Sequence, residues 1–122
     1  MAKVINVTGT RCPPKGLAKF DKWYSENHIP DMMGVFPKLR KAIRYKLVGT
    51  SSIEKFKISG AKQPEYPMFI TLYEFDSKKD FDDFNTDPVL NASREDWVKI
   101  AKETGAEVVF RAQYEYMKTF ER

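Results

Sequence analysis

Four segments of the chain carry the short apolar or alternating patterns that are typical of β-strands. Residues 3–8 are rich in β-branched side chains. Residues 39–49 alternate apolar and cationic side chains, and residues 107–120 alternate aromatic and polar ones. Residues 68–75 are apolar on both faces, which is typical of a strand covered on both sides. We therefore expect four strands, with residues 68–75 at the centre of a sheet.

A helix is predicted over residues 17–27, where apolar side chains recur at helical spacing. One stripe of this helix consists of Leu17, Phe20, Tyr24 and His28. Pro30 disfavours helical geometry at the residue before it, so we expect the helix to end near His28.

A second helical region follows the strand at residues 68–75. Ser77, with Asp80 in the first turn after it, resembles a helix N-cap. Asp87 followed by Pro88 is a second start signal, because proline is favoured at the first position of a helix. Gly105 is a typical residue just beyond a helix end. We expect a split helical region that ends there.

The order of these elements predicts the fold class. Prolines and glycines indicate loops at residues 11–16 and 50–67, and residues 55–58 are expected to add at most a short strand extension. The order is then β-α-β-β-α-β over a single domain, residues 1–122. This is the α+β, ferredoxin-like arrangement, a four-stranded antiparallel sheet with both helices on one face.

The second face of such a sheet has no helix to cover it. Along residues 68–75, one face carries Met68, Ile70 and Leu72, and the other carries Phe69, Thr71, Tyr73 and Phe75. An apolar patch of that size is unusual on a monomer, and a homodimer that packs sheet on sheet is the simplest way to cover it. An aromatic-lined cavity, between sheet and helices or between two sheets, would suit a small-molecule ligand.

Composition narrows the classes of function. The net charge of +4 comes with no nucleic-acid-binding motif. No apolar run approaches the length of a membrane span, and the first residues lack the apolar core of a signal peptide. One cysteine and one histidine cannot form a zinc site in one chain, and a single cysteine fits a reducing compartment. We expect a cytoplasmic protein without a metal, a cofactor, a nucleic-acid partner or a membrane partner.

His28 is the first candidate for chemistry, because histidine is the side chain that exchanges protons near neutral pH. It follows Tyr24 by one turn and precedes Asp31, which is placed to orient it. The candidate catalytic set is therefore His28, Tyr24 and Asp31. Structural alternatives exist for each: a histidine favoured by the helix dipole, a core tyrosine and a helix-capping aspartate.

The segment FDKWYSENHIPDMMGVFPKLRKAIRY resembles the characteristic stretch of EthD-like proteins in the dimeric α/β-barrel superfamily. The matching positions are Trp23-Tyr24, His28-Ile29-Pro30-Asp31, Pro37 and Arg44-Tyr45. The resemblance implies a ferredoxin-like domain whose sheet forms a dimeric α/β barrel. The superfamily also holds lactone isomerases, polyketide cyclases, cofactor-free monooxygenases and haem-handling enzymes, so it implies His28 as a general acid or base.

The barrel suggests which residues bind a ligand. We assign the face with Phe69, Thr71 and Tyr73 to the barrel interior. Arg44 and Tyr45 are strand neighbours and face opposite ways, so only one of them can reach the cavity. Arg44 is suited to clamp a carboxylate, although a solvated strand face is an equal alternative. The expected ligand-binding set is Trp23, Arg44, Tyr45, Phe69, Thr71 and Tyr73.

These observations favour a protein that binds a small organic molecule, cyclic or aromatic, in a barrel pocket. Its enzymatic form is cofactor-free acid–base chemistry at His28, of the isomerase, cyclase or lyase type. Two alternatives stay open at this point: a non-catalytic accessory or binding protein of a catabolic pathway, and a dimer whose apolar face is entirely an interface.

Overall fold

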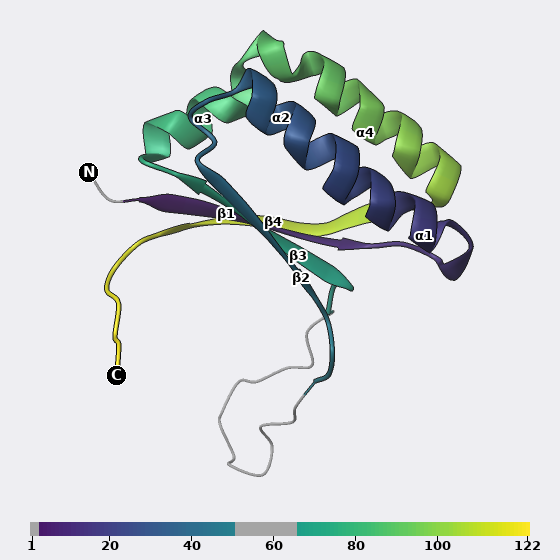
Figure 1. Cartoon of the computed structure of the whole chain (residues 1–122), viewed down its shortest axis with the longest axis horizontal. Helices are drawn as coiled ribbons and strands as arrows, with labels where there is room; N and C mark the ends of the chain where they lie inside the picture. The colour runs from purple at the N-terminus through teal and green to yellow at the C-terminus, as the bar shows by residue number, and fades with distance from the viewer. Residues whose placement is uncertain (1–2, 51–65) are drawn as a thin grey trace.

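The computed structural model describes residues 3–50 and 66–122, which form a four-stranded antiparallel sheet with helices packed on one face (Figure 1). The elements in chain order are β1 (Val4–Arg11), α1 (Pro14–Trp23), the π-helical turn η1 (Tyr24–His28), α2 (Ile29–Val35), β2 (Lys41–Lys46), β3 (Phe69–Phe75), α3 (Lys78–Thr86), the 3-10 turn η3 (Pro88–Leu90), α4 (Asn91–Thr104) and β4 (Glu107–Glu115). The α+β, ferredoxin-like prediction is confirmed.

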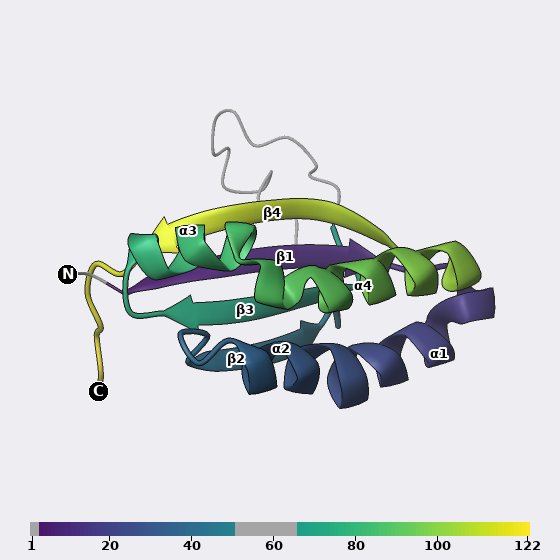
Figure 2. The same ribbon diagram turned by 90° about the horizontal axis from the view of Figure 1, so that it is seen from above.

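The strands lie in the order β2-β3-β1-β4, so β3 has a neighbour on each side, as its apolar pattern predicts. All three pairings are antiparallel. Thr8 of β1 lies opposite Thr71 of β3 on one side and Arg111 of β4 on the other. Seen from above, the helices lie over the sheet in two rows that run roughly along the strands, α1 with α2 and α3 with α4 (Figure 2).

The first helix begins three residues before the position predicted from the sequence, residue 17. Residues 11–16 were expected to form a loop, but α1 begins at Pro14, where the missing N–H costs no hydrogen bond. Gly16 lies inside this helix because α1 passes close to the end of α4. A Cβ atom at Gly16 would lie 2.6 Å from the Cβ of Thr104.

The expected end of the helix near His28 is also wrong. The chain continues through Pro30 into α2, and the N–H of Ile29 donates to the carbonyl of Tyr24, five residues back. This wider π turn accommodates a proline that would clash with the carbonyl four residues earlier in a regular α-helix. His28 therefore lies within a continuous helical segment rather than at its end.

The second helical region follows its sequence signals. The N–H of Asp80 donates to the Ser77 hydroxyl, at 3.2 Å, and caps α3. The N–H of Val89 donates to Asp87 in the same way, at 2.9 Å, where η3 begins. Gly105 ends α4 with φ +80°, a conformation that glycine adopts without strain.

Two strands, β2 and β4, are shorter than the sequence predicted. The alternation at residues 39–49 yields only β2, and β4 ends at Glu115 rather than near residue 120. Both are edge strands, so each is held by hydrogen bonds on one side only. The strand extension expected at residues 55–58 lies outside the described residues.

The two faces of the sheet differ in what covers them. Phe69, Thr71 and Tyr73 are buried beneath the helices. They therefore face a space within one chain, between sheet and helices, which is one of the two cavity positions that the sequence left open, and the assignment of this face to a barrel interior is corrected. No described helix covers the opposite face (Figure 1), which carries Ile5, Val7, Ile43, Tyr45, Ile70, Leu72, Phe110, Ala112 and Tyr114. We call this surface the open face.

Phe20 anchors α1 on the sheet. It is 0% exposed, and its ring centroid lies 5.6 Å from that of Tyr24, 6.4 Å from that of Phe69 and 5.5 Å from that of Trp97. Aromatic rings at these separations add to the free energy of apolar burial. The stripe predicted from the sequence is thus the buried face of the helix.

We predict that Phe20→Ala lowers the free energy of unfolding by about 3–5 kcal/mol, because it leaves a cavity where α1 meets the sheet. Urea denaturation followed by circular dichroism measures this loss. Lys22→Ala, an exposed change in the same helix, serves as the control and should cost less than about 0.5 kcal/mol. A loss below about 1 kcal/mol for Phe20→Ala would contradict the anchoring role.

Candidate functional site

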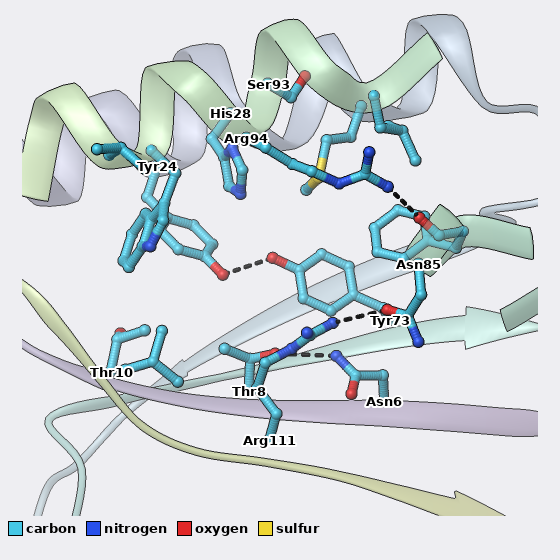
Figure 3. A pocket seen from close by; sticks show the side chains of 16 residues that line it. Asn6, Thr8, Thr10, Tyr24, His28, Tyr73, Asn85, Ser93, Arg94 and Arg111 are labelled. Carbon is cyan, nitrogen blue, oxygen red and sulfur yellow. Dashed lines mark hydrogen bonds between the residues drawn. The ribbon is translucent and has the colours of Figure 1, made fainter. Parts of the chain in front are cut away.

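A pocket of about 330 Å³ lies between the helices and the sheet, and we call it the helix–sheet pocket (Figure 3). Tyr24 and His28 project into it from η1, and Tyr73 projects from β3. Arg94 reaches it from α4 and Arg111 from β4. The side chains on its walls thus come from segments far apart in the sequence, and only the fold brings them together.

The floor of the pocket is polar because of the two-residue period of β1. The floor residues from this strand are Asn6, Thr8 and Thr10, all buried on the helix-covered face. Asn6 donates to the Thr8 hydroxyl at 2.9 Å and accepts from the Gln113 amide at 2.8 Å. These hydrogen bonds satisfy the buried amide and hold the floor in place.

A buried pair of tyrosines forms one wall. The Tyr24 and Tyr73 hydroxyls are 2.5 Å apart and share a hydrogen bond in which either can be the donor (Figure 3). Burial raises the pKa of both phenols, and the Thr71 hydroxyl partly offsets the shift by its hydrogen bonds. Both tyrosines are therefore neutral near pH 7 and act as hydrogen-bond donors rather than as bases.

His28 lies beside this pair, with its ring stacked on Trp23 at a centroid distance of 4.7 Å and an interplanar angle of 20°. The Tyr24 ring approaches it edge-on at 5.0 Å. Burial, and secondarily the charge of Arg44, lower the pKa of His28 from 6.5 to about 4. The imidazole is therefore neutral near pH 7.

No described residue fixes the tautomer of His28. Its Nδ1 atom is buried without a hydrogen-bond partner among the described residues. A ring nitrogen that is held by a protein group has a defined proton position, and this one has none. Because Nδ1 is covered, Nε2 is the nitrogen left to meet a bound molecule.

Asp31 does not orient His28, so that expectation is not met. Its side chain is exposed in α2 and does not line the helix–sheet pocket. The continuation of the helix through Pro30 explains this, because Met32 rather than Asp31 takes the buried position on the pocket side.

Arg44 has a structural partner of its own and does not line the pocket. Its Nη1 donates to the Asp21 carboxylate at 2.6 Å and to the Ser25 hydroxyl at 2.7 Å. The guanidinium also lies over the Tyr24 and Phe69 rings, 4.6 and 4.8 Å from their centroids. Arg44 therefore braces η1 against the sheet, and its expected role as a carboxylate clamp is not supported.

Most of the other expected ligand-binding residues also lie outside the helix–sheet pocket. Tyr45 is 50% exposed on the open face, opposite to Arg44 as the strand period requires. Trp23, Phe69 and Thr71 pack behind the pocket wall without lining it. Of the six, only Tyr73 lines the pocket.

Sequence reasoning missed several lining residues, chiefly Asn6, Thr8, Thr10, Arg94, Trp97 and Arg111. A signal existed for β1, because Asn6, Thr8 and Thr10 alternate with Ile5, Val7 and Gly9. A polar row on a strand of a small, well-covered sheet is expensive to bury and therefore indicates a polar cavity. Nothing comparable marks Arg94, which lies among other charged residues of α4.

Other kinds of site have little support in the part of the chain that the structure describes. Within residues 3–50 and 66–122, no three His, Cys, Asp or Glu side chains are grouped so that they could hold a metal ion. No helix among these residues is long and apolar enough to cross a membrane. Cys12 is buried, with its Sγ 3.5 Å from the Thr104 carbonyl oxygen.

Comparison with known proteins gives matches in structure only. No protein-family model matches the chain, and no curated protein matches its sequence. Among solved structures, an EthD family protein (named for ethyl tert-butyl ether degradation) from Bacillus halodurans has a TM-score of 0.62 at 18% identity, over 96% of this chain and 100% of that one.

Two further solved structures share the arrangement. A hydroxynitrile lyase from Passiflora edulis has a TM-score of 0.64 at 12% identity, over 98% of this chain and 97% of that one. A dimeric protein of unknown function with a ferredoxin-like fold, from Bacteroides fragilis, has a TM-score of 0.56 at 18% identity, over 93% of this chain and 96% of that one. The chain therefore has the ferredoxin-like fold that is found in EthD family proteins.

Proposed function

We propose that the helix–sheet pocket binds a small organic molecule, cyclic or aromatic, and that His28 exchanges a proton with it without a cofactor. The observation that carries the proposal is a neutral imidazole, with no hydrogen-bond partner for Nδ1 among the described residues, that lines a pocket beside two buried phenols. The pocket volume of about 330 Å³ is roughly twice the 150 Å³ cavity that accommodates benzene. A substituted ring fits such a space.

The groups present suit one class of reaction. His28 Nε2 takes a proton from an acidic C–H or O–H of the substrate, and the electron pair stays on the substrate as an enolate or alkoxide. A hydroxyl of the Tyr24–Tyr73 pair donates a hydrogen bond to that oxygen. The developing negative charge also raises the pKa of the imidazole toward the range that suits proton transfer. Return of the proton to another carbon of the substrate completes an isomerisation. In a cyclisation the enolate attacks a carbonyl carbon of the same molecule, and the resulting alkoxide takes the proton. In a lyase step the alkoxide becomes a carbonyl as a C–C bond breaks, and the departing carbanion takes the proton.

The names of structural relatives support this class of reaction without specifying it. One similar structure is a hydroxynitrile lyase, and another is an EthD family protein. At 12% and 18% identity these relatives share the fold with this chain, so the substrate must be inferred from the pocket itself.

A non-catalytic binding protein is the second candidate, and one observation favours it. No described residue forms a hydrogen bond with Nδ1 of His28, and Asp31 is exposed in α2, so ring packing rather than a polar group orients the imidazole. Catalytic histidines are usually held by a third group that fixes the tautomer. A pocket that only binds its ligand has no such requirement.

A homodimer is the proposed assembly. The open face carries Tyr45, 50% exposed, and Tyr114, 57% exposed, beside the aliphatic side chains of three neighbouring strands. One structural relative is described as dimeric. A second copy that packs its own open face on this one removes the apolar surface from water.

We predict that His28 titrates in the folded protein with a midpoint of about 4 rather than 6.5. It is the only histidine, so NMR of the imidazole protons as a function of pH reports on it alone. The same sample unfolded in urea is the control and should titrate near 6.5. A folded midpoint near or above 6 would contradict the burial of the ring.

The same shift predicts acid sensitivity. As pH falls from 6.5 toward 4, the unfolded chain takes up a proton at His28 that the folded chain does not, so stability decreases. The loss approaches about 3 kcal/mol at the acid end of this window. Urea denaturation at pH 7 and pH 4.5 should show a smaller loss for His28→Asn than for the wild type, and equal losses would contradict this linkage.

We predict that His28→Asn lowers proton transfer by roughly 100-fold while ligand binding persists. Ligands are first identified by NMR screening of small cyclic carbon acids. Deuterium incorporation from D₂O into a bound carbon acid then measures the transfer. Asp31→Asn, an exposed change three residues away, is the matched control and should leave the rate unchanged. Tight binding without exchange in the wild type would favour the non-catalytic candidate.

For assembly, multi-angle light scattering should give about twice the monomer mass of 14.2 kDa. Leu72→Glu places a charge at the centre of the open face and should shift the mass to that of the monomer. Val35→Glu on α2, where the valine is already 44% exposed, is the control and should remain dimeric. A wild-type monomer at micromolar concentration would overturn the proposed dimer.

A further inference from the structure

The charged side chains that line the helix–sheet pocket are all positive among the described residues. Two arginines, Arg94 and Arg111, line it, and no aspartate or glutamate in the described part of the chain does. His28 is neutral near pH 7 and adds nothing to balance them. A pocket wall with unbalanced positive charge attracts an anion more strongly than a neutral molecule.

We propose that the ligand of this pocket is a small aromatic or cyclic carboxylate, and that Arg111 binds its carboxylate group. The inference rests on the proposed function, because it names the class of molecule that the same pocket takes. It assigns the role of carboxylate clamp to a residue of β4, whereas the sequence motif suggested Arg44 of β2.

Arg111 is available for this role. It extends from the sheet toward Asn85, and its one hydrogen bond to a described residue is a long one, 3.4 Å from Nη2 to Oδ1 of Asn85 (Figure 3). A guanidinium has five N–H donors, so most of its capacity is unused. No carboxylate of a described residue lies within 4.0 Å of it.

Other arginines in the chain show the contrast. The ion pairs of this residue type among the described residues are Arg11–Glu107, Arg40–Asp76 and Arg44–Asp21. Each of those cations has a carboxylate from the protein itself. Arg111 is exposed at the pocket wall and has none among the described residues, so its N–H donors are open to the carboxylate of a ligand that enters the pocket.

Arg94 supports the positive field but is fixed in place. It donates to the carbonyl oxygens of Asp87 and Phe84, at 3.1 and 2.8 Å, and to the amide oxygen of Asn91, at 2.7 Å. All three acceptors are neutral, so its charge is not cancelled. Arg94 holds the connection from α3 to α4 and leaves Arg111 as the group free to reorganise around a ligand.

Geometry favours a carboxylate on a ring. The planar guanidinium binds a carboxylate through two parallel hydrogen bonds, an arrangement that a single phenolate oxygen cannot use. Phe84, Leu90 and Trp97 supply apolar wall for a ring. Arg111, Tyr24 and His28 line the same pocket. A ligand held at Arg111 therefore shares this space with Tyr24 and His28.

Benzoate and benzamide provide the test, since they differ in charge and hardly at all in shape. Isothermal titration calorimetry should show wild-type protein binding benzoate at least roughly tenfold more tightly than benzamide. Arg111→Gln should remove that preference by weakening benzoate roughly tenfold while leaving benzamide unchanged. Arg122→Gln makes the same change in net charge at an exposed position and should leave both affinities unchanged.

The outcomes separate this inference from the proposed function. Benzamide binding as tightly as benzoate, or an Arg111→Gln protein that keeps the preference, would overturn the carboxylate assignment and leave a small-molecule pocket standing. Failure of both probes to bind at millimolar concentration would overturn both. Arg111→Lys keeps the positive charge but lacks the planar guanidinium, so it should retain part of the preference for benzoate. This variant tests the assignment even if Arg111→Gln does not fold.

Discussion

The rest of the structure depends on the packing of one helical stripe against the buried face of the sheet. Phe20 is fully buried among aromatic rings, and Tyr24 is held to Tyr73 of the central strand by a hydrogen bond of 2.5 Å. These contacts fix both the height and the rotation of the helix above the sheet. They decide that the next residue on the stripe, His28, lies over the polar floor of a pocket rather than in solvent.

The π turn explains how a histidine can occupy that position next to a proline. Its wider backbone carries the helix through Pro30, so His28 is half-buried and stacked on Trp23 within a continuous helical segment. The result is an imidazole without a hydrogen-bond partner among the described residues, which costs stability. The unpartnered atom is the covered Nδ1, so a ligand that meets Nε2 leaves this cost in place, and it is a cost of holding the imidazole at the pocket wall.

Two arginines on the helix-covered face of the sheet have different tasks because their partners differ. Arg44 forms an ion pair with Asp21, and its guanidinium lies over the Tyr24 and Phe69 rings, so it stabilises the fold. Together with burial, which is the larger cause, its charge lowers the pKa of His28. Among residues 3–50 and 66–122, Arg111 has a hydrogen bond to the Asn85 amide and no carboxylate partner. A cation with a protein carboxylate is part of the scaffold, and a cation without one, at the wall of a pocket, is free to bind a ligand.

The sequence by itself determined the elements, because strand and helix periods are local properties of the chain: the central strand at residues 68–75, the Phe20–Tyr24–His28 stripe, and the caps at Ser77 and Gly105. It also singled out His28 and Tyr24. Only the tertiary structure decided which side chains share the pocket with them. The passage of the helix through Pro30 turned Asp31 to solvent, and the pairing of β1 with β4 brought Arg111 beside Thr8. Strand pairing is a long-range property, so no local pattern around Arg111 or Arg94 distinguishes a pocket residue from a solvated one.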